Sequence, residues 1–285
     1  MDEILASSWK QVDQIIDSAL VEDLASSDVT TEALIPPDLE GRASILVNGD
    51  GVLAGMEVSQ AVFWHVDPAL RIEVPIQDGA RVRSGDVVAT IEGKVASILR
   101  AERTALNFLC CLSGIATETA RYVAAVEGCK ARITDTRKAT PGMRLLEKYA
   151  VRIGGGQSHR MHLGDWVLIK DNHLAALPAV GLKEAIKRAR QSSPLKVEVE
   201  VGSLAEAEEA LNASADIIML DNMAVGEIKQ VVELARGRAM IEASGGITLE
   251  NVRQVAEAGV DLISVGAITH SAKALDLSLE LETER

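Results

Sequence analysis

The chain has 285 residues, of which 47% are hydrophobic and 25% are charged, a balance typical of a globular protein that excludes extensive disorder. Its formal net charge of −13 and its aromatic content of only 2% argue against a nucleic-acid partner and against binding to an anionic membrane. Three cysteines, an acidic N-terminus and no apolar stretch of spanning length predict a cytoplasmic protein without a membrane segment.

The first third of the chain is expected to form an α+β domain with a small sheet. Apolar residues from Trp9 to Leu20 recur at helical spacing and predict a helix within residues 7–24. Short extended runs bounded by Gly, Asp and Pro follow, with one helix among them. The extended runs are expected at 43–47, 51–54, 71–74 and 87–91, and the helix at 59–65.

A long helical stretch is predicted over residues 95–127. Its leucines, from Leu99 to Leu112, recur at spacings of seven and three and form one apolar stripe. Gly114 is a candidate point of division between two helices, and we place the domain junction there. This assigns residues 1–113 to a first domain and 114–272 to a second.

The second half of the chain repeats a short strand followed by a short helix. Acidic residues stand near three successive strand ends, at Glu200, Asp221 and Glu242, with a spacing of 21 each time. Such a repeat is typical of the βα units of a parallel barrel, and a doubly wound sheet is the alternative. The strands are expected at 132–134, 166–169, 196–201, 216–220, 240–243 and 262–265.

Polar residues gather just after these strands, where parallel α/β folds bind ligands. Residues 132–170 contain eight basic and three acidic residues, and a basic block within an acidic protein indicates a local anion site. Arg144 and Lys148 are assigned instead to a solvated helix face. The residues expected at the strand ends include Asp135, Thr136, Arg137, Lys138, Lys170, Asp221, Asn222, Ser244 and Ser264.

Three kinds of binding group are expected at this edge. Ser244-Gly245-Gly246 and Ser264-Val265-Gly266 follow the last two strands, and bare backbone N–H groups beside a helix start bind phosphate. His159-Arg160 fits a carboxylate clamp, because the fork of an arginine matches a carboxylate. Glu200 and Asp221 are candidate ligands for Mg²⁺, which takes few protein carboxylates together with substrate phosphate oxygens.

Nine stretches of the sequence resemble the quinolinate phosphoribosyltransferase family. They occur in order over nearly the whole chain, and TRK-x-TPG, GGG-x-x-HR and KDNH in combination are highly specific. The stretches are EDLASSDVTT, GVLAGMEV, RTALNFLCCLSGIAT, TDTRKATPGMRLLEKYAV, RIGGGQSHRMHLGDWVLIKDNH, VEVEV, IIMLDNM, EASGGI and ISVGAIT.

The resemblance implies an α/β fold, with an open seven-stranded, TIM-like barrel and an N-terminal α+β sandwich domain to which the tail, 273–285, returns. It implies transfer of phosphoribosyl from 5-phosphoribosyl 1-diphosphate to quinolinate with decarboxylation, giving nicotinate mononucleotide, diphosphate and CO₂ for NAD biosynthesis. Mg²⁺ is the implied cofactor. The implied assembly is a homodimer with shared active sites, or a hexamer of such dimers.

The resemblance also implies roles for individual residues. Carboxylate binding falls to Arg137, His159 and Arg160, and contact with both substrates falls to the active-site lysines Lys138 and Lys170. Ribose and metal binding falls to Glu200 and Asp221, and binding of the 5′-phosphate falls to Ser244, Gly245 and Gly266. Arg103 matches an arginine that the neighbouring subunit contributes to each site.

Three other functions stay open at this point. A related phosphoribosyltransferase would act on another carboxylated ring, such as nicotinate. A catalytically silent barrel would only bind phosphoribosyl compounds, although the presence of both Glu200 and Asp221 disfavours this. A metal hydrolase would use His159, His162 and Asp165, whose three-residue spacing imitates a ligand set.

Overall fold

The computed structural model describes residues 5, 7–24 and 27–282. Contacts within the chain divide it into two compact units. The first unit comprises residues up to Ala120, 139–155 and those from Ile268 onward, and the second comprises 121–138 and 156–267. Neither unit is one continuous stretch of chain. Among the described residues, no helix is both long and apolar enough to cross a membrane.

The first unit contains a four-stranded antiparallel sheet in the order β12-β1-β5-β3, accompanied by a two-stranded pair, β2-β4. Alternate residues of β1 are buried, at Ala43, Ile45 and Val47, as expected for a sheet with one covered face. The strands are β1 (Glu40–Val47), β2 (Gly51–Val52), β3 (Arg71–Glu73), β4 (Arg81–Val82), β5 (Val87–Lys94) and β12 (Leu277–Glu282). The helices are α2 (Trp9–Leu24), α3 (Val29–Leu34), α4 (Met56–Val66), α5 (Val95–Ala125) and α6 (Arg144–Ile153).

The C-terminal segment belongs to this sheet, because β12 pairs with β1 from Arg42↔Glu282 to Val47↔Leu277. Helix α5 runs without a break, so the division into two helices expected at Gly114 does not occur. The glycine has a different role: a Cβ there would lie 2.3 Å from the carbonyl oxygen of Lys273. Its missing side chain lets the chain leading to β12 pack directly against the helix.

Helix α6 corrects the expectation of a solvated basic face. Lys148 is only 1% exposed and Glu147 likewise 1%. The Glu147 carboxylate accepts hydrogen bonds from the backbone N–H of Thr140 at 3.2 and 3.3 Å. Charged residues at four-residue spacing suggest an exposed face only when no other element covers it, and α6 is covered along most of its length.

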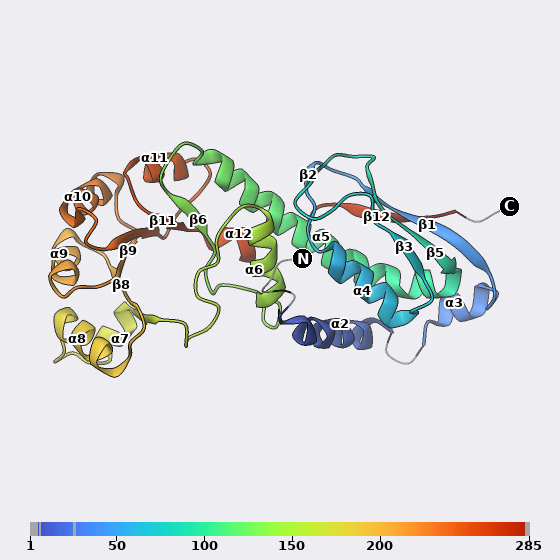
Figure 1. Cartoon of the computed structure of the whole chain (residues 1–285), viewed down its shortest axis with the longest axis horizontal. Helices are drawn as coiled ribbons and strands as arrows, with labels where there is room; N and C mark the ends of the chain where they lie inside the picture. The colour runs from blue at the N-terminus through green and yellow to red at the C-terminus, as the bar shows by residue number, and fades with distance from the viewer. Residues whose placement is uncertain (1–4, 6, 25–26, 283–285) are drawn as a thin grey trace. The chain divides into compact units, whose positions relative to one another are not determined.

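The second unit contains a parallel sheet in the order β6-β11-β10-β9-β8-β7, and helices α8 to α11 pack against its strands (Figure 1). Strand β9 is almost completely buried, as expected when both faces of a parallel sheet are covered. The strands are β6 (Arg132–Thr134), β7 (Val167–Ile169), β8 (Val197–Val201), β9 (Ile217–Asp221), β10 (Met240–Ser244) and β11 (Leu262–Ser264). The helices are α7 (Asp171–Ala175), α8 (Leu182–Ser192), α9 (Leu204–Asn212), α10 (Val225–Ala235) and α11 (Val252–Glu257). Helix α12 (Ala267–His270) begins with the last residue assigned to this unit, and its other residues are assigned to the first.

The predicted α/β fold class is confirmed, with six strands in this sheet where the resemblance implies seven. One more extended segment lies beside β6, where Gln157 forms a single parallel bridge with Thr134. The Gln157 N–H donates to the Ile133 carbonyl at 2.8 Å, and the Gln157 carbonyl accepts from the Asp135 N–H at 3.2 Å. Glycines at 154–156 precede this segment. The pairing there is limited to the single bridge and does not extend into a strand.

The register of the parallel strands decides which side chains share a face. Glu200 pairs with Met219, and Met219 pairs with Glu242, so these three side chains lie on one face of the sheet. Asp221, two residues beyond Met219, extends the same face and pairs with Ser244. The polar strand ends predicted from the sequence therefore belong to one surface.

Candidate functional site

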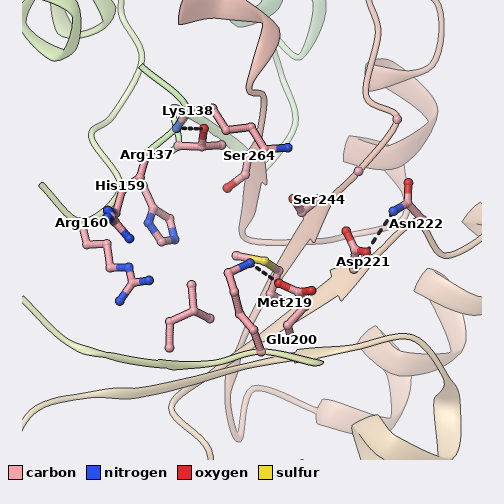
Figure 2. Close-up of a pocket in the computed structure, with 15 residues that line it drawn as sticks. Arg137, Lys138, His159, Arg160, Glu200, Met219, Asp221, Asn222, Ser244 and Ser264 are labelled. Atoms are coloured by element: carbon pink, nitrogen blue, oxygen red, sulfur yellow. Dashed lines mark hydrogen bonds and ion pairs between the residues drawn. The ribbon is translucent and has the colours of Figure 1, made fainter. Parts of the chain in front are cut away.

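A cavity of about 630 Å³ opens at the carboxyl ends of the parallel strands, within the second unit (Figure 2). Each of the six strands contributes to it, either directly or through the residues that follow it. Two apolar side chains, Leu168 and Met219, form part of the wall. The polar lining residues are Thr136, Arg137, Lys138, His159, Arg160, Lys170, Glu200, Asp221, Asn222, Ser244, Gly245, Gly246 and Ser264.

Two arginines form a cationic end of this cavity. The Nε atoms of both Arg137 and Arg160 are buried and have no hydrogen-bond partner among the described residues. Arg160 is only 6% exposed, and one of its terminal nitrogens donates to the Trp166 carbonyl at 3.3 Å. Burial, and then the charge of Arg137, lower the pKa of Arg160. The buried Nε atoms of these two guanidiniums are unused donors, and they form a site suited to an anion.

His159 lies beside these arginines and is held from two directions. Its backbone N–H donates to Asp135 Oδ1 at 2.8 Å, which fixes the segment next to β6. Its ring Nε2 lies 3.4 Å from Glu198 Oε1 and 3.6 Å from Glu242 Oε2. Burial alone lowers the pKa of His159, but these two carboxylates outweigh it and raise the pKa to about 9. The imidazole is therefore a cation at neutral pH.

The two carboxylates that face His159 are themselves completely buried, at 0% exposure. Trp166 Nε1 donates to Glu198 Oε2 at 2.5 Å, and Ser264 Oγ donates to Glu242. Burial, together with the charge of Glu198, raises the pKa of Glu242. Neither glutamate lines the cavity, so Glu242, expected at a strand end, lies instead beneath the site.

Sequence reasoning missed Glu198 and Trp166. Glu198 stands two residues before Glu200 in the VEVEV strand, so strand alternation places both on the same face. That alternation was the available signal. No sequence signal indicated that Trp166 would donate to Glu198, because the two residues are 32 positions apart and meet only through the pairing of β7 with β8.

A second cluster of charged side chains lines the cavity, formed by Lys170, Glu200 and Asp221. Lys170 Nζ contacts Glu200. Asp221 accepts a hydrogen bond from Asn222 Nδ2 at 2.9 Å (Figure 2). Lys138 is exposed, and its backbone N–H donates to Thr136 Oγ1 at 3.0 Å. The carboxylates of Glu200 and Asp221 fit Mg²⁺ by donor type, as oxygen ligands on one face of the sheet beside space for a phosphorylated ligand.

The other end of the cavity is built from backbone. Gly245 and Gly246 have φ values of 85° and 61°, a region that side-chain-bearing residues rarely adopt. A Cβ on Gly245 would lie 2.4 Å from Asn222 Oδ1. The turn after β10 thus requires glycine both for its conformation and for its close approach to the turn after β9.

Two of the predicted binding residues are not part of this cavity. Gly266 follows β11 but does not line the cavity, and Ser264 lines it in its place. Arg103 is an exposed residue of α5 in the first unit.

The ligand set expected for a metal hydrolase does not form. His162 Nδ1 pairs with Asp165 Oδ1 at 2.9 Å, and the His162 side chain is 66% exposed. His159 instead directs its Nε2 toward Glu198 and Glu242.

Comparisons with known proteins agree over nearly the whole chain. The N-terminal domain of quinolinate phosphoribosyl transferase matches residues 28–113, and the C-terminal domain of the same family matches 115–280. A nicotinate-nucleotide pyrophosphorylase (carboxylating) from Mycobacterium leprae is 44% identical over 92% of this chain and 94% of its own length. A mitochondrial quinolinate phosphoribosyltransferase (decarboxylating) from Nicotiana tabacum is 43% identical over 95% of this chain and 82% of its own.

A solved structure agrees equally well. The crystal structure of NadC from Streptococcus pyogenes superposes with a TM-score of 0.92 at 45% identity, covering 96% of this chain and 98% of that one. Both domain matches and full-length relatives well above 30% identity point the same way, and the chain belongs to the quinolinate phosphoribosyltransferase family.

Proposed function

We propose that this chain transfers the phosphoribosyl group of 5-phosphoribosyl 1-diphosphate to quinolinate, and releases diphosphate and CO₂ to give nicotinate mononucleotide for NAD biosynthesis. Family membership supports the reaction class. The observation that carries the substrate assignment is the pair of buried, unpartnered Nε atoms on Arg137 and Arg160, beside the cationic His159. Three cations at one end of a cavity suit a ring with two carboxylates better than a ring with one.

The opposite end of the cavity suits the phosphorylated substrate. The turn at Ser244–Gly246 offers backbone N–H groups that a phosphate can approach closely, because no Cβ covers Gly245. The 5′-phosphate would bind there. With the carboxylates at the arginines, the pyridine nitrogen would then face C1 of the ribose.

Catalysis in this arrangement depends on positioning and on charge. The pyridine nitrogen forms a bond to C1 of the ribose while the bond from C1 to the diphosphate oxygen breaks. Lys138 and Lys170 line the cavity and would stabilise the charge that grows on the leaving diphosphate. Glu200 and Asp221 would hold Mg²⁺, which when bound neutralises diphosphate charge. No protein nucleophile is needed, because holding both substrates in contact supplies much of the rate.

Loss of CO₂ follows from the new positive charge on the ring nitrogen. The bond from C2 to its carboxylate breaks, and the electron pair stays on C2, where the adjacent cationic nitrogen stabilises it. A proton then adds at C2. The cations that held the 2-carboxylate before transfer need only orient it, since the driving charge comes from the substrate itself.

The test is an assay with quinolinate or nicotinate as parallel substrates, each with 5-phosphoribosyl 1-diphosphate and Mg²⁺. We expect nicotinate mononucleotide and CO₂ in equal amounts from quinolinate, and no product from nicotinate. Activity should be lost when a chelator removes the metal and should return when Mg²⁺ is added. Nicotinate mononucleotide from nicotinate without CO₂ would overturn the dicarboxylate pocket. Full activity in the presence of a chelator would overturn the Mg²⁺ assignment.

We further propose a homodimer in which Arg103 of each subunit completes the site of the other. Its exposure on α5 supports such a role. Mixing Arg103→Ala subunits with Arg137→Ala subunits should then restore part of the activity, because one site in each mixed dimer is intact. An absence of recovery, with subunit exchange verified, would contradict the shared site.

A cytoplasmic location is also proposed. It rests on the three cysteines, which are all free in the described structure. Relatives from plants carry mitochondrial or chloroplastic names, so location varies among similar proteins. Cell fractionation followed by immunoblotting distinguishes these locations, and recovery in an organelle fraction would contradict the proposal.

A further inference from the structure

The reaction as described makes no use of two fully buried carboxylates beneath the cavity. Glu198 and Glu242 have 0% exposure and do not line the cavity. A buried charge is costly unless it is paired and hydrogen-bonded. Burying two carboxylates side by side is therefore costly in free energy. Strands of a parallel sheet usually carry apolar residues at such positions.

Each carboxylate is held by a donor on its far side and faces the same atom on its near side. Trp166 Nε1 fixes Glu198, and Ser264 Oγ fixes Glu242. The free directions of both carboxylates converge on His159 Nε2, at 3.4 and 3.6 Å. Strand pairing sets this convergence, because β8 and β10 flank β9 and present their glutamates on one face.

We propose that Glu198 and Glu242 are positioning residues that fix the His159 ring by its Nε2 edge and keep it cationic, so that it meets a carboxylate of the substrate as the third positive group of the clamp. This inference rests on the proposed function for the identity of the substrate. The two glutamates would thus contribute to substrate binding through His159, without contacting the substrate themselves.

The charges around His159 support this assignment. Glu198 approaches from β8 and Glu242 from β10, whereas Arg160 follows it in the chain and Arg137 comes from the segment after β6. Burial at this end favours a neutral imidazole, so without the carboxylates the ring would lose its proton. The balance of burial against the two carboxylates favours the cation, with a pKa of about 9 for His159.

The charge state of His159 can be measured directly, without substrate. The chain has five histidines, so protein labelled with ¹⁵N only at histidine gives a simple spectrum, and His159→Gln identifies the resonance. We expect both ring nitrogens of His159 to be protonated at pH 7.5 in the unaltered chain. In Glu242→Gln and in Glu198→Gln, the midpoint of its titration should fall by at least about one pH unit.

Binding supplies the second readout. Calorimetric titration with quinolinate at pH 8 should show affinity at least about tenfold weaker in the Glu198→Gln/Glu242→Gln double variant, as expected when the imidazole is mostly neutral. Affinity should recover toward that of the unaltered chain at pH 6, where the ring regains its proton. A purely structural loss would be equal at both pH values. Glu257→Gln, which removes an exposed charge paired with Arg253, is the matched control and should change nothing.

Three outcomes would overturn the inference. The first is a neutral His159 ring in the unaltered chain at pH 7.5, which would overturn the inference even if neither variant folds. The second is an unchanged quinolinate affinity of the double variant at pH 8. A tightly bound zinc ion that is lost in Glu242→Gln would assign the three side chains to a metal instead. If the unaltered chain binds no quinolinate while His159 is cationic, the proposed substrate fails and the positioning role does not.

Discussion

On one side of the cavity, Arg137, His159 and Arg160 present charged side chains, whereas on the other side lies Ser244, which begins the backbone turn through Gly245 and Gly246 (Figure 2). The charged end is deeply placed, with His159 at 8% and Arg160 at 6% exposure. The backbone end is open, and Gly246 is exposed. Both ends suit anions, but they achieve this with different chemistry.

The two ends differ in the source of their positive charge and in the structural requirements of that source. Side-chain cations carry full charges, and burying them requires counter-charges such as Glu198 and Glu242, which in turn need donors of their own. Backbone N–H groups carry partial charges that need no counter-ion, but they require a chain conformation that only glycine adopts easily. The charged end should therefore be sensitive to pH and to charge, and the backbone end to shape.

The largest expected effect is at the charged end. Arg137→Ala removes one of the two guanidiniums that have a buried, unpartnered Nε, and we expect quinolinate binding to weaken by about 2–5 kcal/mol, because truncating one partner of a desolvated charge pair leaves the other unpaired. Calorimetric titration measures this loss, with inorganic phosphate as the ligand that should be unaffected. Arg132→Ala, at the exposed start of β6, is the matched control. Equal losses in the two variants would contradict the clamp.

An intermediate effect is expected from pH alone. The pKa of His159 is about 9 in the folded chain and about 6.5 when unfolded, so its contribution to stability is complete below pH 6.5 and is lost as the pH rises through about 9. The loss amounts to about 3 kcal/mol. Urea unfolding between pH 6.5 and 9.5 measures it. His159→Gln should flatten the slope, and an unchanged slope would contradict the assignment.

The smallest of the three effects is expected at the backbone end. Gly245→Ala places a Cβ at a φ of 85°, which costs about 1–3 kcal/mol, and brings it against Asn222. We expect the affinity for inorganic phosphate to fall about tenfold and quinolinate affinity to be unchanged. Gly237→Ala is the control, since its φ is 76° but no atom would lie within 4 Å of the new Cβ. A similar loss of phosphate affinity in both variants would mean that strain alone, and not the turn at the cavity, is responsible.

Much of the fold and of this site followed from local pattern. The repeat of strand and helix predicted a parallel sheet, and polar residues after its strands predicted which edge binds ligands, because carboxyl ends of parallel strands share one edge. Nine of the predicted site residues line the cavity, among them Arg137, Lys170 and Asp221. The resemblance to a known family added the chemistry of the substrates, which spacing alone did not contain.

The tertiary structure alone decided which residues from distant segments contact one another. Trp166 and Glu198 meet because β7 pairs with β8, and Glu242 reaches His159 because β10 lies in the same sheet as β8. Periodicity places a residue on a face of its own strand, but register across strands depends on hydrogen bonds and packing between segments far apart in sequence. The sequence by itself therefore determined which residues reach the binding edge, and the assembled sheet determined which of them line the cavity and which lie buried beneath it.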